Sequence, residues 1–311
     1  MGVLMVIAGF VLLFFSGDWL VKSSVQIARY LKISTLVVGI TVVAFGTSAP
    51  ELLVSLKAVF DGVPDISVGN VVGSNIANIA LVLGTVAIIL PVRVSRKSSV
   101  FFDWTIMMGA SLLFLLFVQN KVIELYEGVI FIILIVIYLV FSVYKSRKQM
   151  GKSGEIILKP TMKISSAIGL LVLAAVGLYF GSKLLVDGVV IVAKGFDISD
   201  RVIGISVVAF GTSVPELATS IMAAVKKETS ISIGNIIGSN IFNLMAILGI
   251  TSVLKPINVS QELISVDIWW MIGVAVLLIL TLLPLKRSVI TRWEGLLLVG
   301  TYLLYMVLLF T

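Results

Sequence analysis

The chain of 311 residues contains no cysteine and no histidine. The absence of cysteine excludes disulfide bonds, thiolate catalysis and thiolate-bound metals. The absence of histidine removes the commonest general base and the commonest ligand of transition metals. Carboxylates, hydroxyls, amides and backbone oxygens remain, and these are the ligands that hard cations prefer.

Charge is also scarce. Only 13% of the residues are charged, 59% are hydrophobic, and the mean hydropathy is +1.17. A soluble domain is about 25% charged. This composition excludes an ordinary soluble enzyme, a disordered chain and a nucleic-acid-binding protein. In a chain of this kind the net charge of +7 reports on membrane topology, because the few charges lie mostly in the loops between spans.

Ten apolar runs are long enough to cross a bilayer, which takes about 20 residues. The sequence therefore predicts an all-α polytopic membrane protein with ten transmembrane helices. The predicted spans are 3–24, 34–59, 67–91, 99–118, 123–144, 164–192, 200–225, 231–254, 265–284 and 290–310.

The segment 145–163 contains six basic residues and separates the fifth span from the sixth. Because basic loops stay cytoplasmic, we expect this linker to lie inside. With alternating spans, the inside loops then hold sixteen of the 23 basic residues. We therefore expect a multi-pass protein of the cell membrane with both termini outside.

An internal repeat with an offset of 165 residues is the strongest pattern in the sequence. Residues 37–52, VVGITVVAFGTSAPEL, match 202–217, VIGISVVAFGTSVPEL, and 66–84 match 231–249 at the same offset. Repeats at a fixed period mark a repeated architecture. The chain divides into a first five-helix repeat at 1–144, the linker at 145–163 and a second repeat at 164–311. Since five spans are an odd number, the second repeat is inverted, a construction that recurs in secondary transporters.

Each GTSxPEL segment interrupts an apolar span. Pro50 and Pro215 lack an amide hydrogen and so free backbone carbonyls about one turn earlier. Irregular backbone at membrane depth is tolerated where it lines a cavity or is buried in protein. Glu51 and Glu216 follow directly, and a carboxylate inside a membrane is a candidate functional group. Retention of both segments for packing alone is the alternative interpretation.

The companion segments, GNVVGSNIAN and GNIIGSNIFN, combine glycine pairs with polar side chains. The glycines permit close helix packing. The polar residues recur at intervals of four and so follow one helical face. They are Asn70, Ser74 and Asn78 in the first repeat and Asn235, Ser239 and Asn243 in the second. Asn75 and Asn240 lie off this face, and we expect them to hydrogen-bond the neighbouring backbone.

A polar face opposite a broken helix with a carboxylate predicts a cation site. Because the repeats face each other, Glu51 and Glu216 can converge, and two carboxylates neutralise one Ca²⁺. Ca²⁺ accepts six to eight oxygens in flexible geometry, whereas Mg²⁺ demands a strict octahedron. Na⁺ also binds oxygen, so competition for shared ligands would be the physical basis of exchange.

The doubled GTSxPE and GNxxGSNxxN segments closely resemble the alpha-repeats of the cation/Ca²⁺ exchanger superfamily (CaCA), and within it the prokaryotic Na⁺/Ca²⁺ exchangers. The resemblance covers the membrane core. It implies antiport of Na⁺ against Ca²⁺ by alternating access, with these ions as substrates, no cofactor, the lipid bilayer as surroundings and no obligate protein partner. It also implies that the first and sixth helices move as gates, and that the ligands are Glu51, Thr47, Ser48, Ala44, Ser74 and Asn78, with Glu216, Thr212, Ser213, Ala209, Ser239 and Asn243.

Other functions stay open at this point. An H⁺/Ca²⁺ antiporter is the nearest alternative, although the second segment lacks the Gln that is typical of that branch. K⁺-dependent relatives carry an acid in the second repeat, and Asn243 disfavours K⁺ coupling. A passive channel would need a continuous pore. An intramembrane enzyme is disfavoured because no nucleophile motif is present. Within the first and sixth helices, Asp18 with Lys22 and Lys183 with Asp187 have the spacing of ion pairs.

Overall fold

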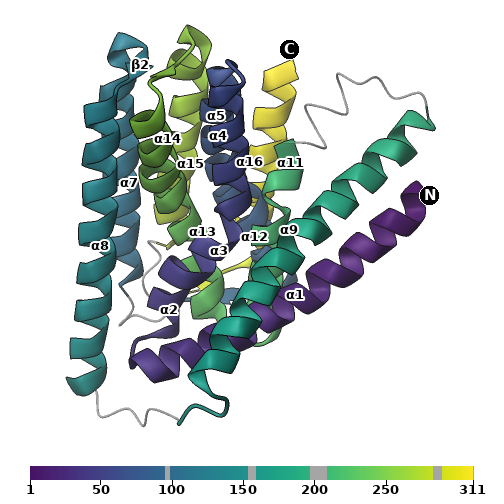
Figure 1. Ribbon diagram of the computed structural model, residues 1–311, viewed down its shortest axis with the longest axis vertical. Coiled ribbons are helices and arrows are strands. Elements are labelled where there is room, and N and C mark those ends of the chain that lie inside the picture. Colours follow the sequence, from purple (N-terminus) through teal and green to yellow (C-terminus); the bar gives the residue numbers. More distant parts are fainter. Residues whose placement is uncertain (95–98, 153–158, 197–208, 283–288, 311) are drawn as a thin grey trace.

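The computed structural model describes residues 1–94, 99–152, 159–196, 209–282 and 289–310, and only the backbone of residues 152, 209, 210 and 310. In these ranges the chain is a bundle of helices with four two-residue strands (Figure 1). Eight helices are long and apolar enough to cross a membrane, or nine if one bent pair counts as a single span. This is an all-helical, multi-pass architecture, as predicted.

The long helices begin and end close to the predicted spans. They are α1 (Gly2–Leu31), α7 (Val100–Phe117), α8 (Leu125–Lys152), α9 (Ile164–Lys194), α15 (Ile268–Leu282) and α16 (Arg292–Phe310). Short 3₁₀ and π segments, η3 (Val118–Asn120) and η6 (Leu263–Asp267), extend α7 and precede α15. Many of their apolar side chains, such as Phe14, Ile137 and Leu304, are exposed, as expected of a surface that faces lipid.

The predicted span 34–59 is a broken helix. It consists of α2 (Thr35–Val38), the π segment η1 (Gly39–Val43), α3 (Ala44–Thr47) and α4 (Ala49–Phe60), with a bend of 44° at Ser48. Pro50 lies in the first turn of α4, where its missing amide hydrogen costs little. The predicted span 200–225 falls partly on 197–208, outside the described residues. Its described part repeats the pattern with α11 (Ala209–Thr212) and α12 (Val214–Val225).

Two buried helices form the centre of the bundle. One is α5 (Pro64–Ile76), η2 (Ala77–Leu83) and α6 (Gly84–Ile89); the other is α13 (Thr229–Ile241), η5 (Phe242–Ile247) and α14 (Leu248–Leu254). A Cβ atom on Gly234 would lie 2.5 Å from the Leu36 carbonyl oxygen, and one on Gly238 would lie 2.6 Å from the Ile40 Cα. The expected close packing at the glycine pair is therefore confirmed for the second repeat. Gly69 and Gly73 meet no described atom within 4 Å.

Helices α1 and α9 pack along each other and cross the rest of the bundle at a slant (Figure 1). Glycines make this approach possible. A Cβ atom on Gly9 would lie 2.7 Å from the Leu185 amide nitrogen, and one on Gly188 would lie 2.8 Å from the Gly2 carbonyl oxygen. The two helices therefore form one closely packed unit, the α1–α9 pair.

Two short ribbons join the halves of the chain. Strand β1 (Val92–Arg93) pairs with β4 (Val289–Ile290), and β2 (Val122–Ile123) pairs with β3 (Ile257–Asn258), both antiparallel. Helix α8 begins beside β2 and runs to the opposite end of the bundle (Figure 1). We call the two ends the β1–β4 end and the β2–β3 end.

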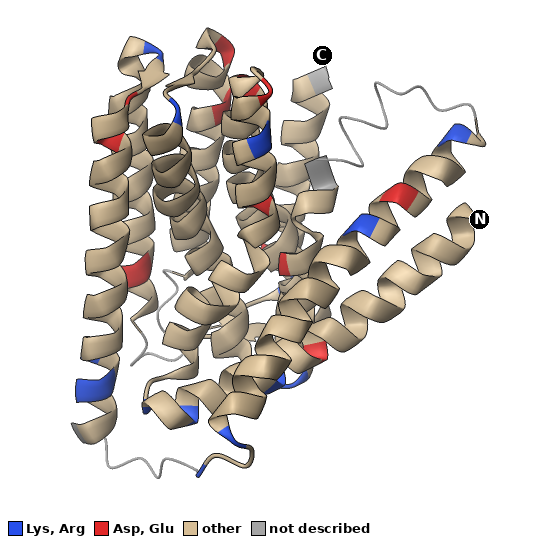
Figure 2. Cartoon of the chain, in the orientation of Figure 1, with Lys and Arg blue, Asp and Glu red and all other residues tan. Residues whose placement is uncertain are grey.

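Charge is distributed unevenly between these ends. Lys and Arg residues gather at the end where α8 finishes, and acidic residues gather toward the β2 end (Figure 2). The ion pair that the spacing of Asp18 and Lys22 allows is formed, with Lys22 Nζ 2.8 Å from Asp18 Oδ2. Lys183 and Asp187 have the same spacing, but among the described residues they do not form an ion pair.

Each half also contains a buried acid–tyrosine hydrogen bond that the sequence analysis did not identify. The Tyr138 hydroxyl donates to Asp103 Oδ1 and the Tyr305 hydroxyl to Asp267 Oδ1, both at 2.9 Å. These bonds join α7 to α8 and η6 to α16. The tyrosines are 167 residues apart and the acids 164, so a search at a fixed offset of 165 misses them.

The α1–α9 contact gives a first prediction. Gly9→Val places a branched side chain against the α9 backbone, and overpacking costs about 1–3 kcal/mol. We expect a lower melting temperature in detergent. Gly300→Ala, where no described atom lies within 4 Å, is the control and should melt like the unmodified protein. Equal melting temperatures for both variants would contradict the packing argument.

Candidate functional site

The helix breaks position two carboxylates deep in the bundle. Glu51 lies in the first turn of α4 and Glu216 in the first turn of α12, and neither side chain is exposed. The positive end of the helix dipole favours a negative charge at this position. Ser48, three residues before Glu51, hydrogen-bonds to Glu216, so the two helix breaks meet in the bundle.

Polar contacts at the break cross from one half of the chain to the other. Ser48 Oγ donates to Glu216 Oε1 at 3.3 Å. Thr47 Oγ1 donates to Asn235 Oδ1 at 3.1 Å and lies 3.4 Å from Ser239 Oγ. The first broken helix thus contributes directly to the surroundings of the second carboxylate.

Several buried polar atoms in this region have no hydrogen-bond partner among the described residues. They are both carboxylate oxygens of Glu51, Glu216 Oε2, both side-chain polar atoms of Asn78, Ser213 Oγ and Asn243 Oδ1. Buried polar groups are nearly always paired, so such a cluster requires an explanation. The two carboxylates contribute most of these atoms' polarity, and a buried carboxylate charge is costly without a counter-charge. The donor set is almost entirely oxygen, which fits a hard cation.

Symmetric hydrogen bonds brace the helices behind the glutamates. Asn70 Nδ2 donates to Ser55 Oγ at 3.1 Å and to the Glu51 carbonyl oxygen at 3.3 Å. Asn235 Nδ2 donates to Ser220 Oγ at 3.1 Å. These contacts join α4 to α5 and α12 to α13. Sequence analysis missed the two serines, although Ser55 and Ser220 are themselves 165 residues apart.

The asparagines off the polar face connect the two central helices. Asn75 Nδ2 donates to the Asn240 carbonyl oxygen at 3.4 Å, and Asn240 Nδ2 donates to the Ile236 carbonyl oxygen at 2.7 Å. Their expected bonding to backbone is confirmed. Asn243 Nδ2 donates to Asn75 Oδ1 at 3.1 Å, which leaves the Asn243 amide oxygen free.

Both central helices change to π-helical turns within the polar face. Asn78 lies in η2 and Asn243 lies in η5, directly after the GSN sequences. Segments of this kind are frequent at functional sites because the wider turn breaks the regular hydrogen-bond ladder. Apolar periodicity does not reveal such a turn, so the sequence analysis did not predict it.

The remaining predicted residues lie around the same region. Ser74 is buried on α5, and Thr212 is partly buried at the end of α11. Ala44 is buried, but its carbonyl oxygen already accepts a hydrogen bond from the Ser48 amide. This oxygen also lies 3.3 Å from the Thr47 hydroxyl, which shares its one hydrogen with Asn235 Oδ1. Ala209 begins α11, and its side chain is outside the described set.

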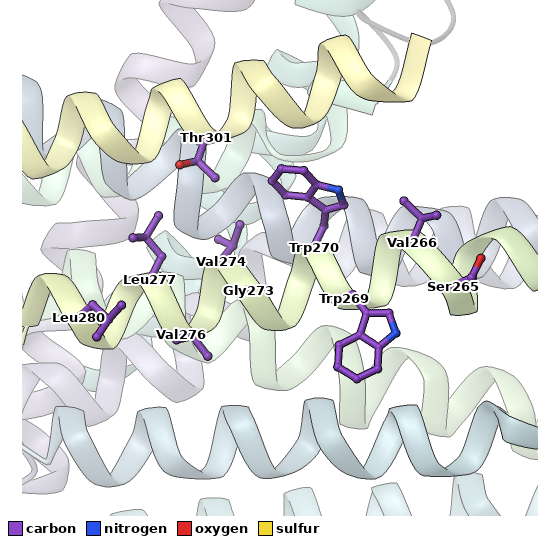
Figure 3. A pocket seen from close by; sticks show the side chains of 10 residues that line it. All are labelled: Ser265, Val266, Trp269, Trp270, Gly273, Val274, Val276, Leu277, Leu280 and Thr301. Carbon is purple, nitrogen blue, oxygen red and sulfur yellow. The ribbon is translucent and has the colours of Figure 1, made fainter. Parts of the chain in front are cut away.

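A separate groove of about 530 Å³ runs along η6 and α15, with Thr301 of α16 at its side (Figure 3). Its lining is mostly apolar and includes Trp269, Trp270 and Leu277. Trp270 points toward α16, whereas Trp269 points to the other side of α15. The groove contains none of the predicted ligands and has the character of a lipid-facing surface.

Comparison with known proteins agrees with the geometry. The family described as "Sodium/calcium exchanger protein" matches residues 1–144 and 166–311. The chain is 37% identical to the "Putative antiporter CaxA" of Alkalimonas amylolytica, over 98% of each chain. It is 32% identical to the "Sodium/calcium exchanger MaX1" of Methanosarcina acetivorans, over 99% of this chain and 98% of that protein. A solved structure of the sodium-calcium exchanger NCX_Mj, soaked without Na⁺ and Ca²⁺, superimposes with a TM-score of 0.84 at 33% identity over 99% and 98% of the chains.

The fold and the buried oxygen-rich centre define a multi-pass membrane antiporter for cations, with Ca²⁺ among its substrates. The chain belongs to the sodium/calcium exchanger family of the cation/Ca²⁺ exchanger superfamily. Members of this family are secondary transporters rather than enzymes, and they use the transported ions without a cofactor.

A second prediction concerns the carboxylates. Glu51→Gln and Glu216→Gln each remove one negative charge while keeping the side-chain shape. Because ligand charge sets Ca²⁺ affinity, we expect each variant to lower Ca²⁺ binding by at least about ten-fold in a titration of the purified protein. Glu262→Gln, at an exposed carboxylate, is the control. Near-normal Ca²⁺ binding by either site variant would exclude a shared two-carboxylate site.

Proposed function

We propose that the chain exchanges Na⁺ for Ca²⁺ across the cell membrane by alternating access, with both ions bound at one midplane site shared by two inverted repeats. The observation that carries this proposal is the buried pair Glu51 and Glu216 with their unpaired oxygens. A solved relative whose description names sodium-calcium exchange supports it.

The proposed inverted repeats are residues 1–144 and 164–311, joined by a cytoplasmic linker at 145–163. The two ribbons support this division. Each ribbon joins a loop of one repeat to a loop of the other, and the ribbons lie at opposite ends of the bundle. With ten spans, six separate β1 from β4 and four separate β2 from β3. Because both numbers are even, the two strands of each ribbon lie on the same side of the membrane.

The proposed ion ligands are the glutamates together with neighbouring hydroxyl, amide and backbone oxygens. They are Glu51, Thr47, Ser48, Ala44, Ser74 and Asn78 from the first repeat, and Glu216, Thr212, Ser213, Ala209, Ser239 and Asn243 from the second. One Ca²⁺ cancels the charge of both carboxylates. Na⁺ uses the same oxygens, so one ion displaces the other. A ligand role for Ala44 requires release of a hydrogen bond that its carbonyl accepts here.

Coupling to H⁺ is the second candidate, because two adjacent buried carboxylates can also bind a proton. Na⁺ is favoured by the number of neutral oxygens around them. Three further buried oxygens have no partner among the described residues: Ser213 Oγ, Asn78 Oδ1 and Asn243 Oδ1. A Na⁺ ion would coordinate such oxygens, whereas a proton binds to a carboxylate without them.

Ion gradients imposed separately on vesicles test the coupling ion. We expect an outward Na⁺ gradient to drive ⁴⁵Ca²⁺ uptake, and K⁺ or H⁺ gradients of equal size to drive none. Vesicles that contain the Glu51→Gln variant are the matched control. Uptake driven by the pH gradient alone would favour the H⁺ antiporter, and flux without any counter-ion would favour a channel.

We also propose that both termini lie outside, in a chain that functions among lipids without an obligate protein partner. The gathering of basic residues at the β1–β4 end supports this orientation. The absence of cysteine allows a direct test. A membrane-impermeant thiol reagent added outside intact cells should label Lys121→Cys and leave Lys148→Cys unlabelled until the cells are opened. The reverse pattern would invert the topology.

A further inference from the structure

The two repeats are not equivalent in how the α1–α9 pair contacts them. Helix α1 packs along α12, where Gly17 approaches the Ala218 carbonyl: a Cβ atom there would lie 3.3 Å from that oxygen. The corresponding helices at an offset of 165 are α9 and α4. Both are described in full, and they make no comparable contact. The structure is therefore asymmetric about the α1–α9 pair.

Exposure shows the same asymmetry. Ala218 and Met222 of α12 correspond to Leu53 and Lys57 of α4. Met222 is only 7% exposed beside α1, whereas the Lys57 side chain is 77% exposed. Ala218 is half-buried, whereas Leu53 is 59% exposed. One face of α4 thus lacks the cover that α1 provides for the equivalent face of α12.

An ion pair joins α1 to the end of α12. Asp18 binds Lys226 and also Lys22, and the Asp18 side chain is only 19% exposed. Within the described part of the chain, the Asp18–Lys226 ion pair bridges two separate helices, whereas Lys22–Asp18 and Lys57–Asp61 each join neighbouring turns of one helix. It lies at the β1–β4 end, because Thr229 Oγ1, three residues after Lys226, donates to the Arg93 carbonyl oxygen.

The equivalent positions in the other half carry the same two charges with the signs exchanged. Asp18 corresponds to Lys183 on α9, and Lys226 corresponds to Asp61 at the end of α4. Asp61 lies toward the β2–β3 end, since Lys255 beside β3 donates to the Val59 carbonyl oxygen. Here Asp61 pairs with Lys57 of its own helix, at 2.7 Å, and Lys183 is exposed. The second pair of equivalent positions therefore carries opposite charges as well, but Lys183 and Asp61 are not paired with each other in this structure.

We propose that Asp18–Lys226 and Lys183–Asp61 are alternate ion pairs, and that each holds the α1–α9 pair in one of the two access states. The inference rests on the alternating access of the proposed function. In the present state the Asp18–Lys226 ion pair is formed. When the two helices α1 and α9 move together, α9 covers α4 in the way that α1 now covers α12. Asp18 then separates from Lys226, and Lys183 comes within reach of Asp61. An inverted repeat reaches its second state by exchanging the environments of equivalent elements in this way.

The charge signs fit the two ends of the bundle. The partner on the central bundle is a lysine at the basic β1–β4 end and an aspartate at the acidic β2–β3 end. On the α1–α9 pair, Asp18 has the charge that attracts the lysine of the β1–β4 end, and Lys183 has the charge that attracts the aspartate of the β2–β3 end. Lys22, by contrast, pairs with Asp18 within α1 and so stays paired in both states.

A cysteine at Leu53 reports which state is populated, because α9 would cover this position in the second state. In the Leu53→Cys background, Asp18→Asn removes the ion pair of the present state, and we expect thiol labelling to slow by up to about five-fold, the range of a partly exposed ion pair. Lys183→Gln removes the ion pair of the second state and should leave labelling as fast or faster. Lys22→Gln is the control and should change nothing. A slowing by both Asp18→Asn and Lys183→Gln, or by Lys22→Gln as much as by Asp18→Asn, would overturn the proposal.

Cross-linking tests the second pair directly. In the full-length protein in vesicles, Asp61→Cys with Lys183→Cys should form a disulfide under mild oxidation and stop ⁴⁵Ca²⁺ uptake, and a reductant should restore uptake. The two single-cysteine variants are the controls. Failure to cross-link in vesicles that transport Ca²⁺ would overturn the alternate pair. Failure of a Na⁺ gradient to drive uptake would instead overturn the coupling ion, and the labelling and cross-linking results would stand independently.

Discussion

Glu51 and Glu216 bring two negative charges into a part of the protein where neither side chain reaches solvent. A charge in this position is costly unless a counter-charge and oxygen or amide partners surround it. The broken helices, the unpaired oxygens and the cation specificity all follow from this constraint. Breaking α3 from α4 and α11 from α12 brings a helix N-terminus to each carboxylate, and the two central helices supply neutral oxygens around them.

The second constraint is that both halves must build one site. Thr47 and Ser48 contact Asn235, Ser239 and Glu216 across the repeat boundary. The glycines of α13 let α2 and η1 approach closely enough for these contacts, and the ribbons fix the ends of the bundle. The α1–α9 pair contacts the two halves of this centre unequally, because α1 packs along α12 and pairs with Lys226, whereas α9 makes no comparable contact with α4. That difference is the structural basis for treating Asp18 and Lys183 as two members of one alternating device.

The amino-acid sequence predicted the helical class, most span boundaries and the position of both helix breaks. These features depend on local properties: apolar length, a proline in a fixed place and a repeat that can be read directly. From the expectation of two repeats that face each other, it also predicted that the two breaks meet, and the hydrogen bond from Ser48 to Glu216 agrees with this. The π-helical turns at Asn78 and Asn243 and the bracing serines Ser55 and Ser220 were not predicted, since hydropathy carries no signal for either feature.

The sequence by itself determined which groups are available: oxygen ligands, two buried carboxylates and a doubled scaffold to hold them. Only the tertiary structure decided which of these groups meet. Asp18 and Lys22 pair because they lie one turn apart on one helix, yet Lys183 and Asp187, with the same spacing, do not. The difference arises from packing: α1 lies against α12, where Lys226 adds a second cation beside Asp18, while α9 does not lie against α4. Two segments with the same sequence pattern thus make different contacts, because the helices that carry them pack against different neighbours.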